Sequence, residues 1–305
     1  MCIRDRYFAL GLPTDFNEVV TNADISESGF NPKLNLNYKI SNNNLIYASV
    51  SKGFRLGGVN DVVPVAFCGD ELAAVGEDAP ENFESDQLWN YEIGYKGVLN
   101  NGKVILNLAA FYNDWSNIQQ LRRLACGFGY TANAGEAAIS GIDVDLKAKL
   151  SQSFEANLGL GLLNPKITQG GVGLDAEDGD RILFTPTTTA AVSLKYFKSI
   201  SDNASLFGNL NWNYVGERFS TYGAQRSGGD RAEAAARTLD AYNLANLRIG
   251  VSFNQGFEVS AFVNNLTGEA ANYGDVISLA IESVGRPRYT TNRPRTIGLQ
   301  LRAFF

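Results

Sequence analysis

The C-terminal residues of the chain alternate strictly between apolar and polar side chains. Apolar residues stand at every second position from Ile297 to Phe305, and polar residues or glycine fill the positions between, from Thr296 to Arg302. Because successive side chains of a strand point to opposite faces, this pattern predicts a β-strand with one apolar and one polar face. Its length suits a tilted transmembrane strand of roughly 9 to 11 residues. An amphipathic edge strand of a soluble sandwich has the same pattern, so one strand does not decide between the two.

The same period of two recurs along the whole chain and predicts an all-β protein. Each repeat places large apolar or aromatic residues on one face and Asn, Asp, Glu, Lys, Ser or Gly on the other. We count eleven such segments, which lie at 34–40, 46–50, 89–95, 104–112, 142–150, 154–162, 190–196, 206–214, 247–253, 257–263 and 295–305.

The connections between these segments alternate in length. Short polar turns are expected at 41–44, 98–102, 151–153, 198–203 and 254–256. Long irregular connections are expected at 53–86, 123–135, 165–185, 216–240 and 265–293. Short turns on one side and long loops on the other are typical of an outer-membrane barrel with extracellular long loops. Compact soluble domains rarely need several loops longer than about 12 to 15 residues.

Aromatic residues near the strand ends fit the interfacial girdles of such a barrel. They are Tyr38, Trp89, Tyr95, Tyr112, Trp115, Tyr196, Trp212 and Tyr214. Together with the period and the loop lengths, they predict an antiparallel transmembrane β-barrel.

Composition narrows the classes of function. The chain has 305 residues, a formal net charge of −6 and no His. The absence of His excludes Ser-His-Asp and Cys-His catalysis and His-based zinc sites. The acidic balance argues against nucleic-acid binding. We therefore expect neither an enzyme nor a bound cofactor.

The N-terminus and the strand number indicate a piece of a larger protein. Residues 1–6 carry no apolar segment of a signal peptide and do not continue the pattern, so we interpret them as a non-native start. Residues 7–305 are interpreted as one domain. Single-chain bacterial barrels normally have an even number of strands, and eleven is odd. We expect an open half-barrel with free edges at 33–40 and 295–305.

Several local sequences resemble, in order, the barrel blocks of TonB-dependent receptors. The first is Ser-Lys-Gly-Phe-Arg-Leu-Gly-Gly at 51–58, and the second is Tyr-Glu-Ile-Gly-Tyr-Lys at 91–96. The later blocks lie at 111–119, 133–143, 179–186, 263–267 and 293–298. The resemblance covers about residues 28–305 and rests on the order and spacing of these blocks.

The resemblance implies a function and a set of partners. Barrels of this family have about 22 strands, so the chain would be the C-terminal half of one, without the N-terminal plug domain. The family takes up scarce nutrients across the outer membrane of Gram-negative bacteria, most often ferric siderophores, with energy delivered through TonB. The implied partners are the nutrient, the plug, TonB, and outer-membrane lipid and lipopolysaccharide. Haem is a less suitable ligand, because haem receptors usually present loop His.

Two other functions stay open at this point. A passive porin-type channel, or a barrel with no transport role, has the same strand pattern, and a plug upstream of residue 1 is the feature that distinguishes the receptor. In the receptor, polar lumen-facing residues would line the wall against the plug. They include Asn107, Asp143, Asp145, Asn211, Arg248 and Gln300.

Loop residues are the candidates for ligand binding. Arginine suits carboxylates and other oxygen anions, and aromatic rings stack on planar ligands. The candidates are Arg55, Arg122, Arg123, Arg218, Arg226 and Arg231, with Tyr130, Phe219 and Tyr222 as aromatic partners. Loop packing and lipopolysaccharide contact are the alternative roles for each of them.

The loops also hold two cysteines and two acidic stretches. Cys68 and Cys126 fall in neighbouring loops on the side that faces an oxidising compartment, so we consider a disulfide, with Cα atoms about 4.4 to 6.8 Å apart. The acidic stretches at 70–86 and 175–180 have oxygen ligands that suit Ca²⁺. Solvated loop charge, screened by divalent ions near lipopolysaccharide, is the explanation that we favour for both stretches, and we assign no metal site.

Overall fold

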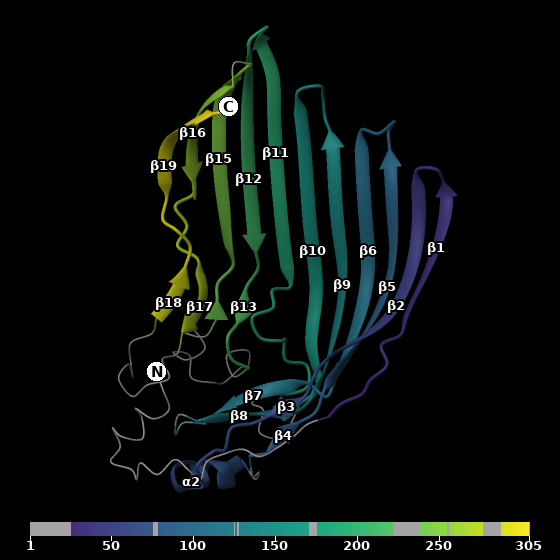
Figure 1. Cartoon of the computed structure of the whole chain (residues 1–305), viewed down its shortest axis with the longest axis vertical. Coiled ribbons are helices and arrows are strands. Elements are labelled where there is room, and N and C mark those ends of the chain that lie inside the picture. The colour runs from purple at the N-terminus through teal and green to yellow at the C-terminus, as the bar shows by residue number, and fades with distance from the viewer. Residues whose placement is uncertain are drawn as a thin grey trace.

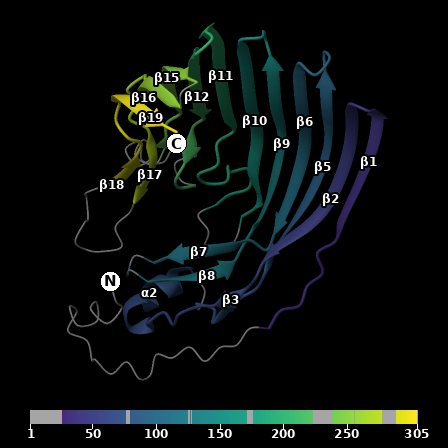
Figure 2. The same ribbon diagram turned by 45° about the horizontal axis from the view of Figure 1, so that its top comes forward.

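The structure, a computed structural model, describes residues 26–75, 79–124, 126, 128–170, 176–222, 238–254, 256–276 and 288–304. The start at 1–6 lies outside this part of the chain. Within it, eleven strands form one antiparallel sheet that curves into an open trough (Figures 1 and 2).

Each of the eleven predicted segments coincides with one strand of this sheet: nine lie wholly within their strands, while 142–150 and 295–305 extend past the ends of theirs. In sheet order the strands are β1 (Lys33–Ser41), β2 (Asn44–Arg55), β5 (Asp86–Leu99), β6 (Val104–Ser116), β9 (Glu136–Lys149), β10 (Phe154–Gln169), β11 (Thr188–Ser201), β12 (Ala204–Val215), β15 (Tyr242–Phe253), β16 (Phe257–Asn264) and β19 (Thr296–Ala303). Strands β1 and β19 lie at the two opposite edges. The half-barrel prediction is therefore confirmed for the described residues.

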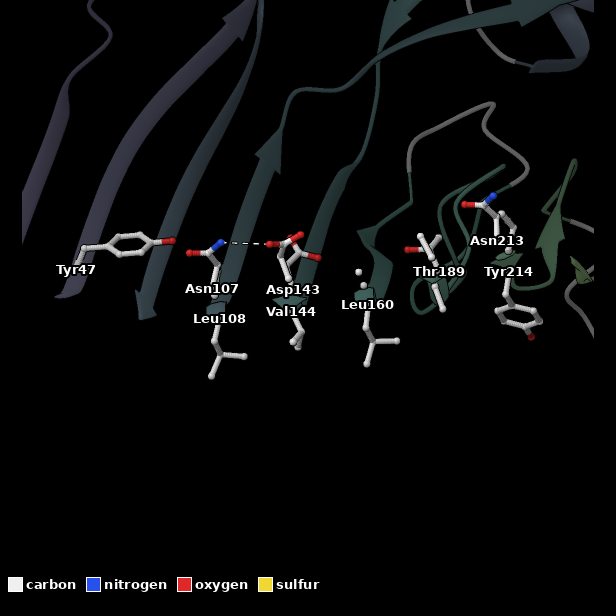
Figure 3. A pocket seen from close by; sticks show the side chains of 16 residues that line it. Tyr47, Asn107, Leu108, Asp143, Val144, Leu160, Thr189, Asn213 and Tyr214 are labelled. Atoms are coloured by element: carbon white, nitrogen blue, oxygen red, sulfur yellow. Dashed lines mark hydrogen bonds between the residues drawn. The ribbon is translucent and has the colours of Figure 1, made fainter. Parts of the chain in front are cut away.

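The two faces of the sheet differ as the period of two predicts. Figure 3 shows the side chains of Asn107 and Asp143 pointing into the concave side, while those of Leu108 and Val144 point away from it. On the last strand, Leu299 and Leu301 are 83% and 72% exposed. They pair with apolar residues of β16, whereas Gln300 pairs with Ser260. The convex face is thus apolar and open, as a lipid-facing surface must be.

Aromatic rings on the concave face lie directly over glycines of the neighbouring strand. A Cβ built on each of these glycines would stand 2.4 to 2.6 Å from a ring atom. The cross-strand pairs are Tyr47 with Gly94, Phe111 with Gly141, Phe207 with Gly250, and Phe262 with Gly298. The missing side chain of each glycine is therefore replaced by a ring, which covers the backbone and fixes the register.

The short turns and the long connections occupy opposite ends of the sheet, as predicted (Figure 1). In the turn between β5 and β6, Asn100 and Asn101 have φ of 48° and 54° and Gly102 has φ of 85°. Asn and Gly tolerate this left-handed region best, which explains why this sequence turns so tightly.

The long connections are more regular than the sequence predicted. They contain β3 (Gly58–Val59), α2 (Val65–Val75), β4 (Asn82–Phe83), β7 (Gln119–Arg123), β8 (Gly129–Asn133), β13 (Arg218–Phe219), β14 (Thr238–Leu239), β17 (Asn272–Val276) and β18 (Arg288–Thr291). Among the described residues, no helix has the length and apolar character needed to cross a membrane.

Candidate functional site at the loop end of the sheet

Two of the long connections are fused into one folded body. A disulfide joins Cys68 of α2 to Cys126 between β7 and β8, with Cα atoms 5.5 Å apart, within the range expected from the sequence. The buried residues around it are Val63, Cys68, Leu72, Tyr130 and Ala132. We call the described residues of 57–85 and 117–135 together the stapled loop unit.

A side chain takes the place of a strand partner inside this unit. The Asn60 Nδ2 donates to the Thr131 carbonyl at 2.7 Å, and the Asn60 Oδ1 accepts from the Thr131 amide at 2.7 Å. The same Nδ2 donates to the Pro80 carbonyl at 2.9 Å. The buried side-chain amide of Asn60 therefore joins the segment after β3 both to β8 and to the segment before β4, which makes the unit rigid.

The candidates Arg122 and Tyr130 lie together inside the stapled loop unit. Tyr130 is 1% exposed and Arg122 is 7% exposed. The Arg122 Nη1 donates to the Tyr130 hydroxyl at 2.9 Å, and the guanidinium stands 5.6 Å from the ring centroid. This placement favours packing over ligand contact for both residues. The side chain of Arg123 lies outside the described part.

The candidate Arg55 ties the stapled loop unit to the barrel wall. It ends β2, and its Nε donates to Oδ2 of Asp86 at 2.7 Å while its guanidinium lies over Trp115, 5.1 Å from the centroid. Trp115 also donates to Asp86, which is 2% exposed. Gln119, the first residue of β7, donates to the Leu56 and Glu84 carbonyls at 2.8 and 3.0 Å. The positive charge of Arg55 is thus neutralised within the protein.

This junction corrects two interpretations of the sequence. Asp86 was grouped with the solvated acidic stretch 70–86, but it is a buried ion-pair partner. Trp115 was assigned to an interfacial girdle, but it contacts Asp86 and Arg55. The alternation along β6 puts it on the concave face with Phe111, opposite to Tyr112.

The candidates Arg218 and Phe219 belong to a second group at the loop end. We call Arg181, Arg218, Phe219, Tyr242 and Tyr273 the aromatic–arginine cluster. The Arg218 guanidinium stands 5.4 Å from the centroid of Tyr242, and the rings of Tyr242 and Tyr273 are 5.4 Å apart. The Arg181 guanidinium stands 4.3 Å from the centroid of Phe219.

The cluster holds a desolvated cation. Arg218 is 9% exposed, its Nη2 donates to the Asn272 carbonyl at 3.0 Å, and its Nε has no hydrogen-bond partner among the described residues. Burial raises the pKa of Tyr273, the neighbouring Tyr242 adds to the rise and Arg218 opposes it. A buried guanidinium with a spare N–H beside neutral phenols can take an anionic oxygen of a planar ligand.

Tyr222 lies apart from this cluster. It is 8% exposed and packs with Ile118, Ala137, Ile167 and Ala176. Burial raises the pKa of its phenol, and a hydrogen bond with Gln120 opposes the rise. Arg226 and Arg231 lie outside the described residues. Sequence reasoning missed Arg181, Tyr242 and Tyr273, although each stands at a strand end or in a long connection like the residues it chose.

The acidic loops make internal hydrogen bonds. Asp178 accepts from the amide of Gly170 and Asp180 accepts from the amide of Glu177, both at 2.9 Å. Within the described ranges no three His, Cys, Asp or Glu side chains gather in a way that could hold a metal ion.

The concave wall carries two recesses. The first has a volume of about 470 Å³ (Figure 3). Its polar groups include Asp143, Asp145 and Asn107, whose amide donates to Asp145 at 3.3 Å. The second has a volume of about 680 Å³ and is lined by residues of β11, β12, β15 and β16 and by Asn292 and Arg293.

These features define a class of protein. A curved antiparallel sheet with a polar concave face, an apolar convex face, tight turns at one end and folded loops at the other is the wall of a transmembrane β-barrel. Residues 5–266 match the model of the family described as TonB dependent receptor-like, beta-barrel. The chain belongs to this family.

Solved structures with the same fold include several uptake receptors. The ferric yersiniabactin uptake receptor FyuA from Yersinia pestis is 19% identical, with a TM-score of 0.66 over 90% of this chain and 37% of that one. The ferric-catecholate import receptor Fiu from E. coli K12 is 17% identical, with a TM-score of 0.60 over 90% and 34%. The ferripyoverdine receptor of the outer membrane of Pseudomonas aeruginosa is 16% identical, with a TM-score of 0.61 over 92% and 33%. The chain thus spans about a third of the length of these relatives.

Proposed function

We propose that the chain forms part of the barrel wall of an outer-membrane receptor that takes up a ferric siderophore by energy coupling. In this proposal the short turns face the periplasm and the long connections face the cell exterior. A plug inside the barrel and TonB are the partners that the mechanism requires. The family match supports the receptor class. The aromatic–arginine cluster at the loop end is the observation on which the choice of a ferric siderophore as ligand rests.

The chemistry of the cluster suits a siderophore. Ferric siderophores offer anionic oxygens on planar or aromatic groups, for which a guanidinium fork and phenol rings are complementary. Arg218 is 9% exposed, so its charge is little screened and its hydrogen bonds to an anion are strong. Arg181 pairs with Glu217 at 3.0 Å, and its guanidinium lies over the ring of Phe219, which follows Arg218 in β13.

The stapled loop unit supports a gated receptor over a passive channel. Figures 1 and 2 show β7, β8 and α2 extending from the end of the sheet toward its concave side. A rigid body in this place narrows the mouth of a barrel, which suits selective capture more than free diffusion. The polar concave wall, with Asn107, Asp143 and Gln300, would then face the plug.

Binding to energy-depleted cells tests the ligand part of this proposal. Cells that express the full-length receptor are titrated with ⁵⁵Fe chelates of catecholate, hydroxamate and phenolate type. We expect saturable binding of one type, weakened about tenfold by Arg218→Gln, because one charge-assisted contact is lost. Arg302→Gln, near the short-turn end, is the matched control and should leave affinity unchanged. Equal affinity of the two variants would contradict the assignment of Arg218.

A further inference from the structure

One aromatic residue at the loop end has a backbone conformation that bulky residues rarely adopt. Phe184 has a φ of 57°, in the left-handed region. The other non-glycine residues with positive φ in the described part of the chain are all asparagines, namely Asn100, Asn101, Asn117 and Asn265. Asn tolerates this region, whereas a bulky side chain there carries a steric cost. A strained residue of this kind points to a functional role.

Packing of the Phe184 ring offsets little of this cost. The residue is 50% exposed. The two residues before it, Ile182 and Leu183, pack instead against the buried cluster that contains Tyr222. The Phe184 amide donates to the Phe219 carbonyl at 2.8 Å, and this hydrogen bond holds the backbone in place. The ring is therefore presented to solvent at a fixed position.

The exposed ring lies beside the aromatic–arginine cluster. A Cβ built on Gly274 of β17 would stand 3.6 Å from Cε1 of Phe184, so the ring lies near a stretch of backbone without a side chain. In the same strand, the carbonyl of Asn272 accepts from the Nη2 of Arg218 at 3.0 Å. Two strand residues span about 7 Å, so one small aryl anion can contact both the ring and the guanidinium.

We propose that Phe184 is a specificity-determining residue that selects ligands with an aromatic ring. Its exposed face stacks on the ligand ring, while Arg218 takes an anionic oxygen of the same group. Within the proposed function, such a residue favours catecholate and phenolate chelates over aliphatic hydroxamates. Its role in uptake therefore rests on the proposed function, whereas its preference for an aryl anion does not.

Benzoate and cyclohexanecarboxylate are suitable probes, because they have the same charge and similar size but only benzoate has an aromatic ring. Binding of each to the full-length receptor in detergent is measured by titration, followed by saturation-transfer NMR. We expect the wild type to prefer benzoate by about three- to tenfold, because contacts between rings add to the burial of apolar area. Phe184→Asn should reduce this ratio of affinities to about one, whereas Phe184→Tyr keeps a ring and should keep the ratio.

Phe184→Asn also separates a ligand role from a packing role. Asn suits the left-handed backbone, so the unfolding temperature of this variant should equal or exceed that of the wild type. A lower unfolding temperature would assign the ring to packing and overturn the proposal.

Phe67→Leu is the matched control. Phe67 is 40% exposed on α2, at the same end of the sheet but in the stapled loop unit, so its replacement should leave the ratio of affinities unchanged. A wild type without preference for benzoate, or an unchanged ratio in Phe184→Asn, would also overturn the proposal. Uptake of ⁵⁵Fe chelates, measured separately, tests the receptor function, so failure of one does not imply failure of the other.

Discussion

At the scale of single residues, buried charges at the loop end connect the barrel wall to the loops. Asp86, in β5, is 2% exposed and accepts hydrogen bonds from Arg55 of β2 and Trp115 of β6, so its carboxylate joins three strands. The sequence did not predict this role. Asp86 ends an acidic stretch, so the sequence alone indicates a solvated residue. Its partner Arg55 lies 31 positions away in the chain, and no local pattern predicts the contact.

Replacing Asp86 by Asn should loosen the stapled loop unit. The substitution keeps the shape but removes the charge that neutralises Arg55, and the expected cost is about 1–3 kcal/mol, because Arg55 retains access to water. Hydrogen exchange of the amides at 117–124 should speed up accordingly. Glu217→Gln breaks a more exposed ion pair with Arg181 and should cost about 0–1 kcal/mol. Similar exchange rates in both variants would show that Asp86 does not anchor the unit.

High pH should open the region around Tyr222. Burial raises the pKa of this phenol above its ordinary value of 10.0, so the folded state retains the proton more firmly than the unfolded state. The stabilisation is therefore complete below the unfolded pKa and is lost as pH rises through the folded pKa. We expect proteolysis of the loop end to increase above about pH 10, and Tyr222→Phe to shift this increase to higher pH. An unchanged profile in Tyr222→Phe would assign the transition to another group.

At the scale of elements, the strands were predictable and the loops were not. The period of two is local, and each of the eleven predicted segments is a strand of the sheet. The hairpin β7–β8 and the helix α2 are held by contacts that no local period encodes, such as Cys68 with Cys126 and Asn60 with Thr131. The aromatic–arginine cluster likewise joins residues of three separate connections and strand ends, so sequence reasoning found only Arg218 and Phe219.

The contacts between aromatic rings and glycines on the concave face should be essential for the pairing of neighbouring strands. A Cβ at Gly250 would lie 2.6 Å from Phe207 and equally close to Ser260 and the Val259 carbonyl, so Gly250→Ala should destabilise the barrel by about 1–3 kcal/mol. Gly159 is the control on the same face, since its Cβ would meet nothing closer than 3.9 Å. Urea unfolding in detergent, followed by tryptophan fluorescence, measures the difference. A loss of stability in Gly159→Ala as large as in Gly250→Ala would contradict the role of the ring.

At the scale of the whole molecule, the sheet formed by the described residues is a wall with two free edges and one apolar, convex side. The strand β1 is exposed along its full length, and Leu34 and Leu36 are each 71% exposed. Open edges leave backbone groups unsatisfied in hydrocarbon, so the wall needs further strands to close. We expect the chain expressed alone to aggregate or to fail to insert into a bilayer.

The lipid-facing register predicts an asymmetric response to charge within the full-length barrel. Leu299→Lys places an ammonium group against lipid and should cost about 2–4 kcal/mol near the midplane. Gln300→Lys places it on the concave side and should cost less, apart from repulsion by Arg248, which donates to Gln300. Folding titrations of both variants into lipid vesicles give the two free energies. A larger loss for Gln300→Lys would reverse the register.

The most direct test of the central claim is energy-dependent uptake of iron by cells that express the full-length receptor. Cells are supplied with a ⁵⁵Fe siderophore that binds, and uptake is followed with and without a protonophore. An energy-coupled receptor predicts saturable uptake that stops when the protonophore is added, while surface binding persists. Uptake that rises linearly with concentration and continues at the same rate without the proton gradient would contradict this account and identify a passive channel.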